Sequence, residues 1–243
     1  MKRVGLLFIV SLLFVNSVRD FSVAAGPPIS SMTGGNKHNL SSLNTSSLVN
    51  FKASANPYDQ RSKQICIFCH TPHNANVQLA LWNRRDPTRT FGHYSSASLV
   101  IDDPGIRATT QYGEPTGSAR LCLSCHDGET ALGAVTSRGG DILFPAEYSR
   151  VAMLNYSGHH PVSFVYDKTV VDILRLRRPD DQFGLPPTGD RVKLDPQSRM
   201  QCTSCHDPHQ DWLNDDELVK PPFWVGPTHD SVCLACHRMT TNP

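Results

Sequence analysis

The 243-residue sequence has no excess of either charge, since it carries 23 lysines and arginines against 22 aspartates and glutamates. A nucleic-acid-binding surface normally appears as a strongly basic domain, so this balance argues against a nucleic-acid partner. Beyond its first 25 residues the sequence also lacks an apolar run of the roughly 20 residues that a membrane-spanning helix needs. We therefore expect no transmembrane segment in that part of the chain.

The first 25 residues have the features of a secretory signal peptide. They begin with the basic sequence MKR, continue with the apolar run VGLLFIVSLLFV and end near small residues, Val23 and Ala25, that suit cleavage. The apolar run is too short to cross a bilayer comfortably, and no cysteine follows the cleavage site for a lipid anchor. We predict removal of residues 1–25 and export of a soluble mature chain, with an uncleaved N-terminal anchor as the alternative.

Regular secondary structure is weakly indicated along the mature chain. Short helices are predicted at residues 79–84, 128–135 and 169–176, whereas residues 86–120 and 177–199 consist mostly of turn-forming residues. The expected fold is mostly irregular chain with a few short helices and little strand. Such a chain buries little apolar side-chain surface of its own, so we expect another component to supply its core.

All eight cysteines fall into four CxxC pairs, and a histidine follows each pair directly. Motif 1 comprises Cys66, Cys69 and His70; motif 2, Cys122, Cys125 and His126; motif 3, Cys202, Cys205 and His206; and motif 4, Cys233, Cys236 and His237. Because only 11 of the 243 residues are histidine, four such matches arise by chance about four times in a million. The repetition therefore marks a functional site.

The CxxCH motif is typical of covalent c-type haem attachment. Two thiols one turn apart add to the vinyl groups of the porphyrin, and the adjacent imidazole becomes the proximal ligand of the iron. A disulfide scaffold or a zinc ribbon leaves the histidine after each pair unexplained, and thioredoxin-like redox pairs do not come in fours. We predict four covalently bound haem c groups, packed at the centre of the fold, whose apolar faces form the missing core.

Seven further histidines are candidates for the distal side of the irons, namely His38, His73, His93, His159, His160, His209 and His229. His73 and His209 each follow the histidine of motif 1 or motif 3 by three residues, with a proline between. The proline turns the chain out of helical geometry, so neither imidazole reaches the opposite face of its own haem. We expect each to bind a neighbouring haem and to hold two porphyrins close together.

The motifs repeat in the order A-B-A-B. Motifs 1 and 3 have the form CxxCHxPH, whereas motifs 2 and 4 lie in the related strings LCLSCH and VCLACH. His38 precedes the first two motifs, and His159 and His160 precede the last two. Each half then supplies two haem sites and two spare histidines, so we predict a first dihaem module at residues 26–150 and a second at residues 151–243.

The strings KHNL, CIFCHTPHN, SGHHPVSF, CTSCHDPH and VCLACH resemble the doubled-CxxCH multihaem cytochromes. With four haems and an N-terminal histidine, the chain is similar to the OmcE-type tetrahaem cytochromes, which polymerise into extracellular wires. The resemblance spans nearly the whole mature chain and implies four distal ligands, namely His38, His73, His160 and His209. His160 is preferred to His159 because a proline follows it. Whether His38 binds a haem of its own chain, or of the next subunit in a head-to-tail homopolymer, is left open.

Other residues have ordinary structural explanations. His93 and His229 are expected to be surface or packing histidines. A methionine in place of a distal histidine would raise the potential of that haem, and the candidates are Met32, Met153, Met200 and Met239. Because enough histidines are present, we expect no methionine ligand.

An iron with two imidazole ligands has no vacant position and serves electron transfer rather than substrate chemistry. The sequence therefore predicts an electron carrier without catalytic residues, exported to the cell surface or beyond as the subunit of a conductive filament. The alternative is a monomeric periplasmic tetrahaem shuttle between redox partners. The third hypothesis, a multihaem enzyme, needs an open iron position, usually with a lysine ligand, and no CxxCK string is present.

Overall fold

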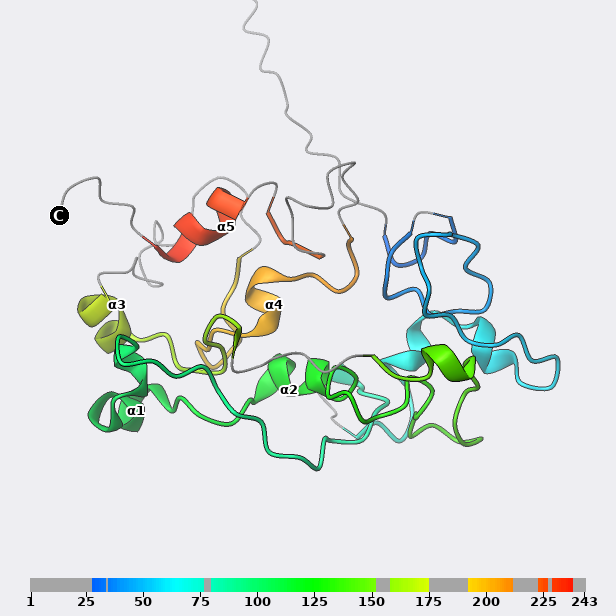
Figure 1. Ribbon diagram of the computed structural model, residues 1–243, viewed down its shortest axis with the longest axis horizontal. Coiled ribbons are helices and arrows are strands. Elements are labelled where there is room, and N and C mark those ends of the chain that lie inside the picture. Colours follow the sequence, from blue (N-terminus) through cyan, green and yellow to red (C-terminus); the bar gives the residue numbers. More distant parts are fainter. Residues whose placement is uncertain are drawn as a thin grey trace, which may run out of the picture.

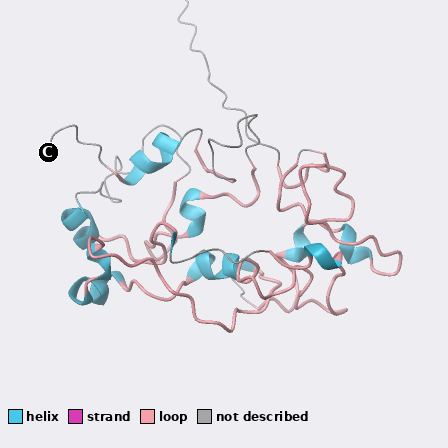
Figure 2. Cartoon of the chain, in the orientation of Figure 1, coloured by secondary structure: helices cyan, strands magenta, loops and turns pink. Residues whose placement is uncertain are grey.

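Irregular backbone connects a few short helical elements (Figure 1). The structure is a computed structural model that describes residues 28–33, 35–76, 80–151, 158–174, 192–211, 223–226 and 229–237. The 3-10 helices are η1 (Gln60–Lys63), η2 (Cys66–Phe68), η4 (Val100–Asp102) and η5 (Ala146–Tyr148), and the α-helices are α1 (Pro104–Thr110), α2 (Gly117–Leu123), α3 (Lys168–Leu174), α4 (Cys202–Cys205) and α5 (His229–Cys236). Extended pairing in this part of the chain is limited to isolated β-bridges, and loops dominate (Figure 2). The described residues thus follow the expected pattern of short helices and little strand.

No helix within these ranges has the length and apolar character needed to cross a membrane. This finding agrees with the absence of a long apolar run after residue 25. The predicted signal peptide, residues 1–25, lies outside the described residues.

Helix α1 lies within residues 86–120, a segment of mostly turn-forming residues in which no helix was predicted. Asp103 caps the helix by accepting a hydrogen bond from the backbone N–H of Gly105 at 2.9 Å, and Pro104 occupies its first position. Both features favour the start of a helix. Gln111, with a φ of 53°, ends the helix in the left-handed region.

The helix predicted at residues 79–84 is absent from its described part, which begins at residue 80. Leu81 has a φ of 48°, a conformation that a helix interior does not contain. The next residue, Trp82, forms an antiparallel β-bridge with His70. Pairing with a distant segment therefore overrides the local helix propensity of these residues.

The helix predicted at residues 128–135 is also wrong, whereas the one predicted at residues 169–176 is confirmed as α3 up to residue 174. Gly133 lies so close to another segment that a Cβ atom there would be 1.7 Å from the carbonyl oxygen of Ile142. Its own carbonyl accepts a hydrogen bond from the Ile142 N–H at 2.9 Å. This close approach of two backbones requires glycine and holds the segment in turns.

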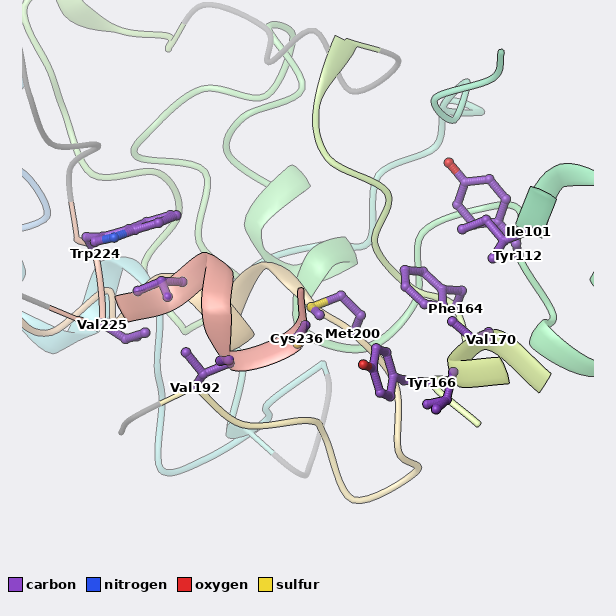
Figure 3. Packing of buried hydrophobic residues seen from close by; sticks show 13 residues of the cluster. Ile101, Tyr112, Phe164, Tyr166, Val170, Val192, Met200, Trp224, Val225 and Cys236 are labelled. Atoms are coloured by element: carbon purple, nitrogen blue, oxygen red, sulfur yellow. The ribbon is translucent and has the colours of Figure 1, made fainter. Parts of the chain in front are cut away.

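Two hydrophobic clusters stabilise the chain. The N-terminal cluster comprises Leu40, Ala53, Phe68, Leu132, Val135 and Ile142. The larger C-terminal cluster (Figure 3) comprises Ile101, Tyr112, Phe164, Tyr166, Val170, Val171, Val192, Met200, Trp224, Val225, Val232, Ala235 and Cys236. Because Ile101 and Tyr112 precede the predicted module boundary at residue 150, the C-terminal cluster joins residues of both predicted modules.

The N-terminal described segment packs against the second module. The backbone N–H of Ile29 donates to the carbonyl of His209 at 2.8 Å, and the side-chain amide of Asn36 donates to the same carbonyl at 3.3 Å. The backbone N–H of Lys37 donates to a carboxylate oxygen of Asp211 at 3.2 Å. These contacts place the segment with the first upstream histidine beside the loop that follows motif 3.

Candidate functional site

Each CxxCH motif forms a single tight turn. In all four, the backbone N–H of the histidine donates to the carbonyl of the first cysteine, at 2.7, 3.0, 3.0 and 2.8 Å for motifs 1 to 4. Motif 1 begins on η2, motif 2 at the end of α2, motif 3 on α4 and motif 4 at the end of α5. Side chains at positions i, i+3 and i+4 of such a turn are neighbours. Every motif therefore presents two thiols and an imidazole together.

Three of the motif histidines lie close to a second imidazole ring. The pairs and the separations of their ring centres are His70 and His209 (6.2 Å), His38 and His126 (6.2 Å), and His160 and His237 (6.1 Å). With metal–nitrogen bonds of about 2.0 Å and each nitrogen about 1.15 Å from its ring centre, two imidazoles on opposite sides of one metal ion have centres about 6.3 Å apart. The separation in each pair is thus close to that of two imidazoles on one metal ion, and it is His160, not His159, that lies beside His237.

Four of these imidazoles have their Nδ1 atom held by an acceptor. The acceptors are the carbonyls of Ala80 for His70 (2.6 Å), Pro208 for His38 (3.2 Å) and Pro161 for His160 (2.8 Å), and a carboxylate oxygen of Asp207 for His209 (3.3 Å). Because a carbonyl or an ionised carboxylate only accepts, Nδ1 carries the proton in the neutral form of each ring, and the lone pair is then on Nε2. Metal-binding histidines are usually fixed by such a second hydrogen bond. Nε2 of each ring is therefore the available metal donor.

His93 has the opposite arrangement. Its Nε2 atom lies 3.1 Å from Oδ1 of Asp102, and its ring packs edge-on against Tyr112 with the ring centres 4.8 Å apart. A ring whose Nε2 is held by a carboxylate does not offer that atom to a metal. His93 is therefore a packing histidine, in agreement with the interpretation from sequence.

The methionines in the described residues are also occupied elsewhere. Met200 is buried in the C-terminal cluster, and the sulfur of Met32 accepts a hydrogen bond from the side-chain amide of Asn39 at 3.7 Å. Met153 and Met239 lie outside the described residues. The structure therefore brings neither Met32 nor Met200 forward as an alternative ligand.

Motif 3 presents His206 beside the indole of Trp224, with the ring centres 5.3 Å apart. Of the four predicted distal ligands, His73 remains after the three observed pairs are assigned. Its side chain is exposed, and its carbonyl accepts a hydrogen bond from the hydroxyl of Thr71 at 2.8 Å. The pairing of His73 with His206 stays a prediction.

Burial keeps two of the paired rings neutral. His38 stacks on Phe223, with ring centres 4.1 Å apart and planes 8° from parallel, and burial lowers its pKa to about 4. Burial also lowers the pKa of His126 to about 4. The Nδ1 atom of His126 is buried and has no hydrogen-bond partner in the described structure. Because neutral imidazole is the form that binds a metal, both rings are in the state that ligation requires.

Thiols of consecutive motifs lie near one another. The neighbouring thiols are Cys69 with Cys125, Cys122 with Cys202, and Cys205 with Cys236. Burial, together with the neighbouring thiols, raises the pKa of Cys69 and of Cys205 to about 12. Cys66 and Cys233, the first and last pairs' leading cysteines, are exposed. The motifs therefore follow one another in chain order, and α5, α4 and α2 succeed each other across Figure 1.

In the described part of the chain, the cysteines and histidines are arranged neither in disulfides nor in a group of three or more metal ligands. All eight cysteines lie in the described residues, and none forms a disulfide. Within the same ranges, no group of three or more histidine, cysteine, aspartate or glutamate side chains is arranged to hold a metal ion. A structural zinc site uses four protein ligands, whereas the imidazoles here meet in pairs.

Two tryptophans that the sequence analysis did not single out adjoin motifs 1 and 3. Trp82 and Trp224 form antiparallel β-bridges with His70 and His206, respectively. The indole Nε1–H of Trp82 donates to the hydroxyl of Ser124 in motif 2 at 3.0 Å. The sequence signal that could have identified these two residues is the presence of a tryptophan after each CxxCHxPH string. The repeat was not recognised because the spacing differs, with 12 residues from His70 to Trp82 and 18 from His206 to Trp224.

Comparison with known proteins assigns no family to this chain, because no protein-family model and no curated protein matches its sequence. The motifs, the ring pairs and their hydrogen bonds are therefore the basis on which a function is assigned.

Proposed function

We propose that the protein is a tetrahaem c-type cytochrome that carries electrons and is not an enzyme. The observation that supports this most directly is the set of three imidazole pairs with ring centres 6.1–6.2 Å apart, each including the histidine of a CxxCH motif. Each motif would hold one haem c through its two cysteines, with its histidine as the proximal ligand. When bound, each haem supplies an iron that takes up and gives back one electron.

The distal ligands follow from the ring pairs. His209 would serve motif 1, His38 would serve motif 2 and His160 would serve motif 4, and His73 is proposed for motif 3 by elimination. In this assignment the second module would supply the distal ligand of motif 1.

Hydrogen bonds to Nδ1 hold these ligands in place. A ring anchored to a backbone carbonyl keeps one tautomer and one orientation, so it needs little rearrangement when the charge of the metal changes. With an imidazole on both sides of the metal position, no place is open for a substrate. The arrangement therefore favours electron transfer over catalysis.

The order of the motifs supports transfer along the molecule. A thiol of each motif lies near a thiol of the next motif. The exposed cysteines, Cys66 and Cys233, belong to motifs 1 and 4. We place electron exchange with redox partners at these two ends. Motifs 2 and 3 then connect them.

The contact between His38 and His126 within one chain supports a carrier that completes its ligands without a second subunit. Assembly into the extracellular filament that the sequence resemblance implies then does not require His38 to cross to a neighbour. Export, to the periplasm or beyond the cell, is proposed from the N-terminal sequence. Electron microscopy of the exported protein distinguishes filaments from single molecules.

The ligation state of the purified holoprotein tests the proposal. Haem content, measured by the pyridine haemochrome assay and by intact mass, is expected to be four per chain. Low-temperature EPR of the oxidised protein is expected to show low-spin ferric iron alone. Fewer than four attached haems, or a high-spin ferric signal, would contradict the proposal, and a high-spin signal would favour the enzyme hypothesis.

A further inference from the structure

Arg84 is a fully buried cation, with a side chain that is 0 % exposed. Its guanidinium donates to three neutral carbonyls, those of Ser124 (3.1 Å), Leu132 (2.8 Å) and Ala131 (2.8 Å). In the described structure no carboxylate forms a direct ion pair with it, and the nearby buried carboxylate of Asp127 interacts with it only through its electrostatic field. The guanidinium is therefore hydrogen-bonded to backbone carbonyls alone, and Asp127 compensates its charge without a direct contact.

This charge lies between motifs 1 and 2. The residue before it, Asn83, is fixed to motif 1, because its backbone N–H donates to the Cys69 carbonyl at 2.8 Å and its side chain donates to the Ile67 carbonyl at 2.5 Å. The guanidinium itself reaches the Ser124 carbonyl inside motif 2. Burial raises the pKa of the Cys69 and Cys125 thiols, and the charge of Arg84 opposes that rise at both. Both haem-attachment turns therefore experience the same cation.

The second half has no equivalent cation. Residues 81–83 pair with motif 1 as residues 223–225 pair with motif 3, so Gly226 occupies the position that corresponds to Arg84. Gly226 is buried, and a Cβ atom there would lie 2.5 Å from the hydroxyl of Ser231, which leaves little room for a side chain. Among the residues that the structure describes, no other lysine or arginine is buried.

We propose that Arg84 raises the reduction potentials of the haems at motifs 1 and 2 above those of the haems at motifs 3 and 4. This inference rests on the proposed function. A positive charge in the low-dielectric interior stabilises an added electron nearby, and mobile ions cannot screen it there. The first electrons added to the oxidised protein then reside on the haems of motifs 1 and 2. The difference in potential favours electron transfer from motifs 3 and 4 towards motifs 1 and 2.

Potentiometric titration of the holoprotein, followed in the visible absorption bands, tests the proposal. In the Arg84→Gln variant, two of the four potentials should fall by at least about 59 mV, a tenfold change in a one-electron equilibrium. Arg84→Lys keeps the charge and should preserve most of the difference. Two-dimensional NMR assigns the shifted pair through contacts of the haem substituents with the Trp82 indole.

Arg89→Gln is the matched control. Arg89 contacts the same loop, through the carbonyl of Asp127 at 3.1 Å, but it is partly exposed and forms an ion pair with Glu129 at 3.2 Å. Removing this charge should leave all four potentials unchanged, because a counter-ion and solvent already compensate it.

The outcomes separate this inference from the proposed function. Four low-spin haems with unshifted potentials in Arg84→Gln overturn the role of Arg84 and leave the cytochrome assignment intact, whereas absence of haem overturns the assignment itself. Should Arg84→Gln fail to fold, the salt dependence of the potentials of the unmodified protein still tests the proposal. The gap between the upper and lower pairs of potentials should persist from about 0.01 to 1 M salt, and a gap that is absent or closes with salt overturns the proposal.

Discussion

At the level of single residues, the ring nitrogen that is held differs between the histidines proposed as metal ligands and a packing histidine. His209 donates through Nδ1 to Asp207 and faces His70, whereas His93 is held through Nε2 by Asp102. Both histidines lie in polar loops, and in the sequence only the CxxCHxPH string distinguishes His209 from His93. A matched pair of substitutions tests the difference.

Replacing His209 by methionine should change one centre of the four. A thioether in place of an imidazole raises the reduction potential of the haem that it binds, so one potential is expected to rise and three to stay in place. His93→Met is the control and should leave all four unchanged. Potentiometric titration measures both variants. A shift in the His93 variant, or none in the His209 variant, contradicts the assignment of His209 as a ligand.

Acid should destabilise the protein between about pH 6.5 and pH 4. Burial lowers the pKa of His38 and of His126 to about 4, below the value near 6.5 of a free imidazole. In this range the unfolded chain binds protons that the folded chain does not, so stability is complete above about pH 6.5 and is lost as the pH falls towards 4. Loss of metal ligation would also lower the stability as the pH falls, because a proton competes with the metal for the ring.

The size of this effect is on the order of 3 kcal/mol per ring over the whole range. Urea unfolding at about pH 7.5 and about pH 5 measures it, and the midpoint should be lower at the acidic pH. The His93→Gln variant is the control. Its urea midpoint should fall between the two pH values as that of the unmodified protein does, because His93 is not one of the two rings with a lowered pKa. Equal midpoints at the two pH values would show that these imidazoles are not buried in the neutral form.

The proposed proximal ligands can be named from sequence because CxxCH carries its chemistry in five consecutive residues. The groups that fix the proposed distal rings cannot. The acceptor for Nδ1 of His38 is the carbonyl of Pro208, which is 170 residues away in the chain. A backbone carbonyl is present at every residue, so the sequence contains no sign of which one is used.

At the level of elements, helices α2 and α4 join motifs 2 and 3 through one buried glutamine. Gln201 is 1 % exposed, its Oε1 accepts from the backbone N–H of Ala119 at 3.2 Å, and its Nε2 donates to Asp195 at 2.9 Å. Gly117, with a φ of 54°, lies against this side chain, where a Cβ atom would be 2.6 Å from Nε2. The amide thus fills the space between the two helices and satisfies their backbone.

Substituting Gln201 by alanine should lower the free energy of unfolding by about 2–4 kcal/mol, because it leaves the buried Ala119 N–H without an acceptor and opens a cavity. Ser118→Ala is the control. Ser118 contacts Thr203 across the same helices at 2.7 Å in an exposed position, and its loss should cost less than about 0.5 kcal/mol. Urea denaturation of both holoproteins measures the difference. Similar losses in the two variants would contradict the role of Gln201.

The elements themselves were only partly predictable. Helix α3 follows from its own apolar pattern, with Val170 and Val171 buried on one face. Helix α1 was missed because the residues that start it, Asp103 and Pro104, also favour turns. The helix expected around Trp82 does not form, because that residue pairs with a segment that local propensity does not detect.

At the level of the whole molecule, the two predicted modules are interlocked. His209 of the second module faces His70 of the first, and Ile101 and Tyr112 of the first module belong to the C-terminal cluster. The repeat in the sequence indicated how many candidate histidines each half provides. It did not indicate which motif each candidate lies beside, since that depends on tertiary packing.

If His38 and His73 both bind within their own chain, as proposed, all four irons should stay low-spin in the monomer. His38 faces His126 of the same chain, and its Nδ1 is bonded to Pro208 of that chain. Neither contact requires a second subunit. After dilution and separation by size, the monomer fraction is therefore expected to show four low-spin centres in low-temperature EPR.

Ligation of His38 to a haem of the next subunit predicts instead a high-spin centre in the monomer fraction. A ligand supplied by a neighbour is lost by mass action on dilution, whereas one supplied within the chain is kept. A high-spin signal that appears in the monomer fraction and disappears on assembly would therefore show that His38 binds in the next subunit. His38→Ala gives the reference spectrum, since it lacks this ligand in both arrangements and its motif 2 iron should be high-spin at every concentration. The unmodified monomer should differ from this reference at all dilutions.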